Sequence, residues 1–268
     1  MFLQPVKSLS FITAALLIMA AASADSIPVT NHSFEVPEID PNENPFMAIS
    51  FAPGWTEDDI DPENLSRNTG IFRNTPADSN DHLINPDGDQ LAFLGGYQGN
   101  ALWQYLPETY QEGKSYKLTV GICVSMRIPP PQGSSLVLAF HYLYGSTYPV
   151  DIASVQVPAP PSTSRTLEDF SVTLPVVKAG DPWLGKNIGI AIRGTGMAGG
   201  FWDVDNVRLV EFPRFPELTN DSFVNLDDFA VIASEWLSCT QTTADLTGEG
   251  CVNLKDLILL SEKWLNNV

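Results

Sequence analysis

Two stretches near the C-terminus place oxygen-bearing side chains at the spacing of a calcium-binding loop. Such a loop supplies oxygens from positions 1, 3, 5, 9 and 12 and a backbone carbonyl from position 7. The second stretch would supply the carbonyl of Cys251 and the side chains of Asp245, Thr247, Glu249, Asn253 and Asp256. The first would supply the carbonyl of Phe223 and the side chains of Glu217, Thr219, Asp221, Asn225 and Asp228. Because calcium prefers oxygen ligands, this spacing predicts calcium as a cofactor.

The two stretches belong to a duplicated unit. The segment "ELTNDSFVNLDDFAVIASEWL" (residues 217–237) aligns without gaps with "DLTGEGCVNLKDLILLSEKWL" (residues 245–265). Behind each loop, apolar residues recur at a spacing that predicts an amphipathic helix. Ser222 stands at the turn position that Gly250 fills in the second copy, and Glu217 is longer than Asp245. We therefore expect weaker calcium binding in the first copy. The alternative is a degenerate duplicate kept as a folded tail.

Loop, helix and duplication together resemble a type I dockerin over residues 217–265. The resemblance implies a calcium-dependent module at residues 217–268. Such modules dock onto a cohesin-like partner, usually on a scaffold of polysaccharide-degrading proteins at the cell surface. The family's partner contacts would correspond to Leu226, Asp227, Leu254 and Lys255.

Residues 25–212 have the pattern of β-strands instead. In "SYKLTVGICVSM" and "SSLVLAFHYLY" the apolar side chains alternate with polar ones, which is typical of strands with one buried face. Short strands separated by turns, with no helical run, predict a β-sandwich. Pro213 and Pro216 make residues 213–216 a stiff linker. We expect a mainly β protein that ends in a small pair of helices.

Three segments of this β region resemble jelly-roll, galactose-binding-like domains, which include carbohydrate-binding modules. They are "IPVTNHSFEVP", "GWT" (residues 54–56) and "FWDVDNVRLVE". The resemblance implies a jelly-roll fold, glycan binding, and a calcium ion shared by the first and last strands. The residues that match this calcium site are Glu35 and Asp205, with Asp203 a less clear match.

Glycan binding needs aromatic faces that stack on sugar rings and polar groups that reach the hydroxyls. The predicted ligand residues are His141, Arg193, Tyr97, Trp103 and Trp183. His141 and Arg193 fall opposite the apolar stripes of their strands, so we expect them on an exposed sheet face. For each aromatic residue the alternative is burial in the core, and His141 is equally compatible with a solvated surface.

The sequence lacks the motifs of several enzyme classes. It contains no Gly-x-Ser-x-Gly elbow and no His-Glu-x-x-His zinc motif. The acidic run "WTEDDIDPEN" is typical of a solvated loop. We therefore predict a non-catalytic, glycan-binding protein for polysaccharide utilisation or cell-surface assembly. The alternatives are a glycoside hydrolase or polysaccharide lyase on the same sandwich, and a structural adhesion protein.

The net charge and the N-terminal sequence indicate which partners the protein can bind and where in or outside the cell it works. With 14 basic and 32 acidic residues the 268-residue chain carries a net charge of −18, and it lacks the basic face that nucleic acid requires. Residues 1–24 have the pattern of a cleaved signal peptide, so we expect a secreted or cell-surface protein that does not insert into the membrane. In an oxidising compartment we expect Cys239 and Cys251 to form a disulfide and Cys123 to be a packed free thiol.

Overall fold

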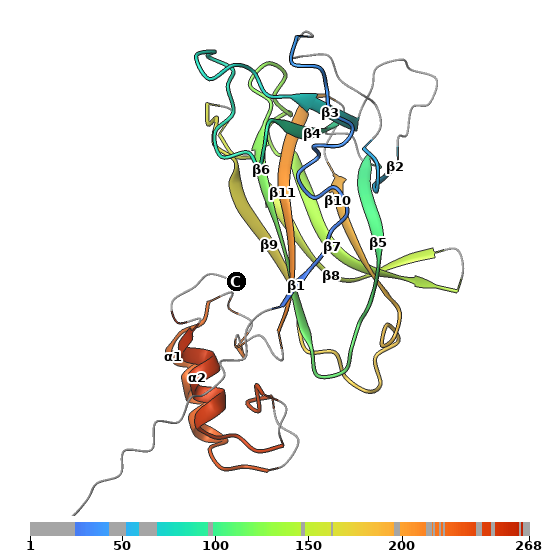
Figure 1. The fold of residues 1–268 in the computed structure, drawn as a ribbon. Coiled ribbons are helices and arrows are strands. Elements are labelled where there is room, and N and C mark those ends of the chain that lie inside the picture. The colour runs from blue at the N-terminus through green and yellow to red at the C-terminus, as the bar shows by residue number, and fades with distance from the viewer. Residues whose placement is uncertain are drawn as a thin grey trace, which may run out of the picture.

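The protein consists of two antiparallel β-sheets packed face to face, followed by two short helices (Figure 1). The predicted mainly β sandwich with a small helical pair is therefore confirmed. The structure is a computed structural model. It describes residues 25–42, 52–58, 69–95, 99–145, 148–161, 163–195, 199–212, 216, 218–219, 221, 223–239, 243–247, 250–262 and 264. The predicted signal peptide lies outside these ranges. Among the described residues, no helix has the length and apolar character needed to cross a membrane.

Each sheet has a strand order that differs from the order along the chain. The six-stranded sheet runs β3 (Thr69–Arg73), β4 (Gln90–Gly95), β11 (Phe201–Phe212), β6 (Ser115–Val124) and β9 (Glu168–Leu174), with β1 (Asp25–Ile27) also pairing with β11. The five-stranded sheet runs β2 (Thr56–Asp58), β5 (Ala101–Thr109), β10 (Asn187–Gly194), β7 (Ser135–Tyr144) and β8 (Tyr148–Pro158). Strand β10 therefore separates β5 from β7, its predecessors in the chain.

The core lies between the two sheets. Its central residues are buried side chains that alternate along their strands, such as Leu118, Val120 and Ile122 of β6 and Ile188, Ile190 and Ile192 of β10. Successive side chains of a strand point to opposite faces. The residues between these core positions therefore point to the outer faces of the sheets. This places Trp103, Tyr105, His141 and Arg193 on the outer face of the five-stranded sheet and Asp203 on that of the six-stranded sheet.

The C-terminal unit packs against the end of the sandwich. Helices α1 (Leu226–Ser234) and α2 (Leu254–Glu262) lie side by side beyond the end of β11 (Figure 1). Val224, Ile232, Val252 and Leu260 form a small cluster of buried residues that also includes Phe212 of β11. The unit thus shares its apolar core with the last strand of the sandwich.

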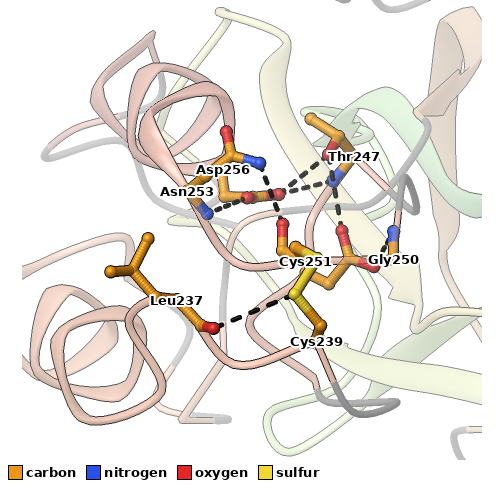
Figure 2. The surroundings of a disulfide bond; sticks show 8 residues. Leu237, Cys239, Thr247, Gly250, Cys251, Asn253 and Asp256 are labelled. Carbon is orange, nitrogen blue, oxygen red and sulfur yellow. Dashed lines mark hydrogen bonds between the residues drawn. A yellow bond between two sulfur atoms is a disulfide. The ribbon is translucent and has the colours of Figure 1, made fainter.

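A disulfide joins Cys239 to Cys251, as predicted, and closes a loop with a sequence separation of 12 residues (Figure 2). Cys123 is a buried free cysteine in β6, also as predicted. Burial raises the pKa of the Cys123 thiol, so it stays protonated and unreactive near neutral pH.

Removing the disulfide tests how far it stabilises the C-terminal unit. The double substitution Cys239→Ser and Cys251→Ser is expected to lower the free energy of unfolding of this unit by about 2–3 kcal/mol, because the open unfolded chain has more conformational entropy. Calorimetry of the full chain measures the loss, and the reduced wild-type protein is the matched control. Equal unfolding temperatures for the oxidised and substituted proteins would contradict the expectation.

Candidate functional site

A cavity of about 500 Å³ lies on the outer face of the five-stranded sheet. Its walls come from all five strands of that sheet. They are formed by Asp58, Ala101, Trp103, Tyr105, His141, Leu143, Pro149, Asp151, Ala191 and Arg193. A larger cavity of about 720 Å³ is lined by proline-rich loops and has no ionisable side chain in its walls. The cavity over the five-stranded sheet therefore combines aromatic walls with groups that can transfer protons, which makes it the better candidate for chemistry.

Strand register brings the central residues of this cavity into one row. Tyr105 of β5 pairs with Gly189 of β10, Gly189 pairs with His141 of β7, and His141 pairs with Asp151 of β8. Because Gly189 has no side chain, Tyr105 and His141 meet across the intervening strand. The Tyr105 hydroxyl lies 3.0 Å from His141 Nδ1, and the two ring centroids are 4.8 Å apart.

The glycine is required by the closeness of the histidine ring. A Cβ atom at position 189 would lie 2.6 Å from the carbonyl oxygen of His141, 2.7 Å from its Cε1 and 2.8 Å from its Nδ1. These distances are shorter than van der Waals contact, so any larger residue would displace either the ring or the neighbouring strand. Gly189 thus allows the Tyr105–His141 contact.

An aromatic wall and an ion pair flank this contact. The ring of Trp103 meets that of Tyr105 edge to face at 5.4 Å, and Trp103 Nε1 donates a hydrogen bond to Asp58 Oδ2 at 3.0 Å. On the other side, Arg193 Nη2 donates to Asp151 Oδ2 at 2.5 Å. The cavity therefore has a flat aromatic side and a charged side.

Burial keeps both partners of the central contact neutral. His141 is 3% exposed, and the loss of hydration lowers its pKa below the usual range. Burial, reinforced by the Asp151 carboxylate, raises the pKa of Tyr105. At neutral pH a phenol therefore faces an uncharged imidazole. Nε2 of that imidazole is buried and has no hydrogen-bond partner among the described residues.

Sequence reasoning found part of this site. His141, Arg193 and Trp103 lie together on the outer sheet face, where the alternation places them. Trp183 instead packs at the edge of the core, with its ring 6.3 Å from that of Tyr142, and does not line the cavity. Tyr97 lies outside the described residues. Asp151 and Gly189 were missed; the glycine in "NIGIAI", an otherwise apolar strand, was the available signal for a close approach.

Comparison with known proteins identifies the family of the sandwich. A family model described as HpiC1 cyclase (HpiC1-like) matches residues 25–210. The chain belongs to this HpiC1 cyclase-like family. No curated protein sequence matches the chain significantly.

Solved cyclase structures resemble this member of the HpiC1-like family. The Stig cyclase Fisc from Fischerella sp. TAU, in complex with (3Z)-3-(1-methyl-2-pyrrolidinylidene)-3H-indole, is 26% identical with a TM-score of 0.57. The match covers 72% of this chain and 100% of that chain. A cyclase from the same organism, in complex with 4-(1H-indol-3-yl)butan-2-one, is 25% identical with a TM-score of 0.55, and the match covers 71% and 99%.

The family corrects the predicted function. A non-catalytic, glycan-binding role in polysaccharide utilisation is wrong, because the sandwich of this HpiC1-like protein matches cyclases, which are enzymes. The alternative of a glycosidase or lyase has no support either. A carbohydrate-binding module in complex with β-1,4-galactotriose also resembles the chain. Its identity of 14% and TM-score of 0.36 are too low to support glycan binding by this protein.

The predicted calcium cofactor and dockerin are likewise not supported and are corrected. The family model ends at residue 210, before the repeats. Among the described residues, no group of three or more His, Cys, Asp or Glu side chains is arranged to hold a metal ion. Glu217 and Glu249 lie outside the described residues.

In both loops, the described carboxylates expected to be ligands accept hydrogen bonds from backbone amides. In the second, Asp256 accepts from the amides of Thr247 and Asn253 (Figure 2). Asp245 accepts from the amide of Gly250. The Cys251 carbonyl accepts from the Asn253 side chain.

The first loop is closed in the same way. Asp228 accepts from the amides of Thr219 and Asn225, and Asp221 accepts from the amide of Phe223. The loop carboxylates thus fold each loop onto the start of its helix.

The calcium site predicted between the first and last strands is not supported either, since neither Glu35 nor Asp205 belongs to a group of three or more potential metal ligands among the described residues. Glu35 Oε1 accepts from the amides of Asp89 and Gln90, at 2.8 and 2.7 Å. Asp205 Oδ2 accepts from the amide of Asp87 at 2.6 Å. The two carboxylates therefore hold the chain at the start of β4, residues 87–90. Glu35 comes from the N-terminal segment and Asp205 from β11.

The four predicted partner-binding residues stand at the start of the helices. Leu226 and Leu254 are 68% and 55% exposed, and Asp227 and Lys255 are exposed as well. No comparison bears on them, and their role in partner binding stays a prediction.

Substitution of Gly189 tests the packing on which the central contact depends. Gly189→Ala is expected to lower the free energy of unfolding by about 1–3 kcal/mol, because the added methyl group overlaps His141. It should also shift the NMR signals of the His141 ring. Gly180→Ala is the matched control, since a Cβ at position 180 meets nothing within 4 Å. Equal losses for both variants would contradict this account.

Proposed function

We propose that this protein is a cyclase that closes a ring in a substrate bearing an indole or a similar flat aromatic group. The observation that carries the proposal is the Tyr105–His141 contact beside Asp151, in the cavity over the five-stranded sheet of a cyclase-family sandwich. A volume of about 500 Å³ is within the range of small-molecule sites.

Two kinds of support favour an indole-bearing substrate. The two solved cyclases described above, at 26% and 25% identity, each hold a ligand with an indole ring system. In this chain, Trp103 and Tyr105 form an edge-to-face aromatic wall beside the charged side of the cavity. Aromatic walls pack well against flat aromatic ligands and also stabilise developing positive charge.

The chemistry of ring closure assigns a role to each group. When an indole carbon attacks a cationic carbon of the same substrate, the electron pair of the indole C=C bond forms the new C–C bond and fills the empty orbital of the cationic carbon. The positive charge thereby moves to the indole ring. The Asp151 carboxylate, held by Arg193, stabilises that charge electrostatically. The ring then loses a proton from the attacking carbon and regains its aromaticity.

The Tyr105–His141 pair can accept this proton. As the Tyr105 oxygen takes the proton from the C–H bond of the substrate, its own proton passes to His141 Nδ1 over the 3.0 Å contact. The C–H electrons return to the indole ring, and the charge ends on the imidazolium. Neutral His141 is a suitable acceptor, because its lowered pKa keeps it unprotonated at neutral pH.

The Tyr105→Phe variant tests whether the Tyr105 hydroxyl acts in proton transfer rather than in substrate binding. The variant keeps the aromatic ring but loses the hydroxyl, so it should bind 4-(1H-indol-3-yl)butan-2-one within about twofold of wild type. It should lose about 100-fold or more in turnover of an indole substrate found by screening. Trp103→Ala should weaken probe binding instead.

The matched control is Tyr144→Phe, which alters a 66% exposed tyrosine outside the cavity. Probe binding is followed by fluorescence and turnover by product analysis. Unchanged turnover in Tyr105→Phe, or wild-type protein that neither binds the probe nor turns over any indole substrate, would overturn the proposal.

The pH dependence follows from the need for a neutral His141. Its lowered pKa keeps the ring neutral to a more acidic pH than usual, so kcat/KM should fall only below about pH 6.5 as the pH decreases. The other ionisable groups that line the same cavity are Asp58, Tyr105, Asp151 and Arg193. His141→Asn should lack this acid limb. A decrease of kcat/KM centred above about pH 6.5 would contradict the role of His141 as a buried neutral base.

We further propose that the protein acts outside the cytoplasm. The signal-peptide pattern of residues 1–24 and the Cys239–Cys251 disulfide support this location. Detection of a mature chain that begins near Asp25 in the exported fraction of the source cells would test it.

A further inference from the structure

The backbone that carries the Tyr105–His141 contact is irregular in two neighbouring strand pairs. The register of β10 against β5 shifts between Asn187 and Gly189, and that of β7 against β8 shifts between Phe140 and His141. Such irregularities interrupt the ladder of backbone hydrogen bonds and change the direction of nearby side chains. A group that fixes the backbone at this place therefore determines how the two rings meet.

The hydroxyl of Tyr110 is such a group. It donates to the backbone carbonyl of His141, with an oxygen–oxygen distance of 3.0 Å, and lies 3.3 Å from the carbonyl oxygen of Gly189. Tyr110 is fully buried and belongs to the core between the sheets. Burial raises the pKa of Tyr110, so the hydroxyl keeps its proton and remains a donor at neutral and at moderately alkaline pH.

Tyr110 is itself held in place by its neighbours. Its amide donates to the carbonyl of Lys186 at 2.9 Å, and its carbonyl accepts from the amide of Gly185 at 2.8 Å. Its ring meets that of Tyr116 edge to face, with the centroids 5.6 Å apart. The Tyr110 hydroxyl therefore has a fixed position relative to the two carbonyls that it contacts.

We propose that Tyr110 is a positioning residue whose hydroxyl fixes the backbone at His141 and Gly189 and thereby the contact between the His141 ring and Tyr105. The inference rests on the proton transfer proposed above, and it adds a residue that does not line the cavity. Without this donor, two buried carbonyls would need water or a shifted backbone to satisfy them. Either change alters the hydration of the His141 ring and its distance from the Tyr105 hydroxyl.

Tyr110→Phe in the full chain removes the donor and keeps the ring. The pKa of His141, followed by NMR titration of its imidazole, should rise by about 0.5 or more toward the usual value, because water reaches the ring more easily. The other ionisable groups that line the cavity are the same in both proteins: Asp58, Tyr105, Asp151 and Arg193.

The same variant should affect turnover more than binding. For an indole substrate, kcat should fall about tenfold or more, with KM within about twofold of wild type, since a misplaced base slows the chemistry without weakening binding. The acid limb of kcat/KM should move to higher pH together with the pKa of His141.

Tyr116→Phe is the matched control. Tyr116 is also fully buried, but its hydroxyl bonds to the backbone of Gln111 and Thr109 instead, at 2.9 and 3.5 Å. This variant loses a buried hydroxyl of the same kind and should leave the pKa of His141 and kcat unchanged. Replacement of Tyr110 by 4-aminophenylalanine restores a donor at the same ring position and should return both values toward wild type, also where Tyr110→Phe folds poorly.

Four results would overturn the proposal. They are an unchanged His141 pKa in folded Tyr110→Phe, an equal change in Tyr116→Phe, no recovery with 4-aminophenylalanine, and a wild-type kcat despite a raised His141 pKa. The titration needs no substrate. Wild-type protein that turns over no indole substrate would therefore refute the proposed function, while the titration still decides whether Tyr110 positions His141.

Discussion

Burial of alternate side chains in the sandwich core is the constraint on which the rest of the structure depends. Ile188, Ile190 and Ile192 of β10 face the core together with Leu136, Leu138 and Phe140 of β7. A shift of one residue in either strand would turn this apolar set to the solvent, so the register is strongly fixed. The same register places Tyr105, Gly189, His141 and Asp151 in one row on the opposite face. Core packing thus positions the proposed proton-transfer pair.

The two outer faces of the sandwich carry different sets of ionisable groups. Over the five-stranded sheet, groups that transfer protons or carry charge contact each other: phenol with imidazole, and guanidinium with carboxylate. Over the six-stranded sheet, one acid stands among aromatic rings without a partner in the described part of the chain. The first arrangement suits a reaction with a transient charge.

Local patterns in the sequence predicted the fold better than the site. Alternation along β6, β7 and β10 correctly predicted which side chains face the core, and therefore that His141 and Arg193 lie on the other face. The expected exposure of His141 is wrong, because the ring is covered by its neighbours in the cavity and is 3% exposed. The Tyr105–His141 contact could not be predicted this way, since it depends on β10 lying between β5 and β7. Strand order of this kind results from long-range packing and leaves no local pattern.

The calcium prediction failed because carboxylates at the same spacing occur both in calcium-binding loops and at the capped start of a helix. In α1, Asn225 is the N-cap, and the Asp228 side chain accepts a hydrogen bond from the Asn225 backbone amide. A carboxylate at this distance from the loop is also what a calcium loop requires. The residue pattern alone does not distinguish a carboxylate that caps a helix from one that binds a cation.

A crystal structure of the full chain with 4-(1H-indol-3-yl)butan-2-one would test the central claim most directly. The account predicts that the indole ring lies against Trp103 and Tyr105, with the Tyr105 hydroxyl and the Asp151 carboxylate facing the ligand. A ligand bound elsewhere on the sandwich, with the cavity over the five-stranded sheet left vacant at saturating concentration, would contradict the assignment of this cavity as the active site.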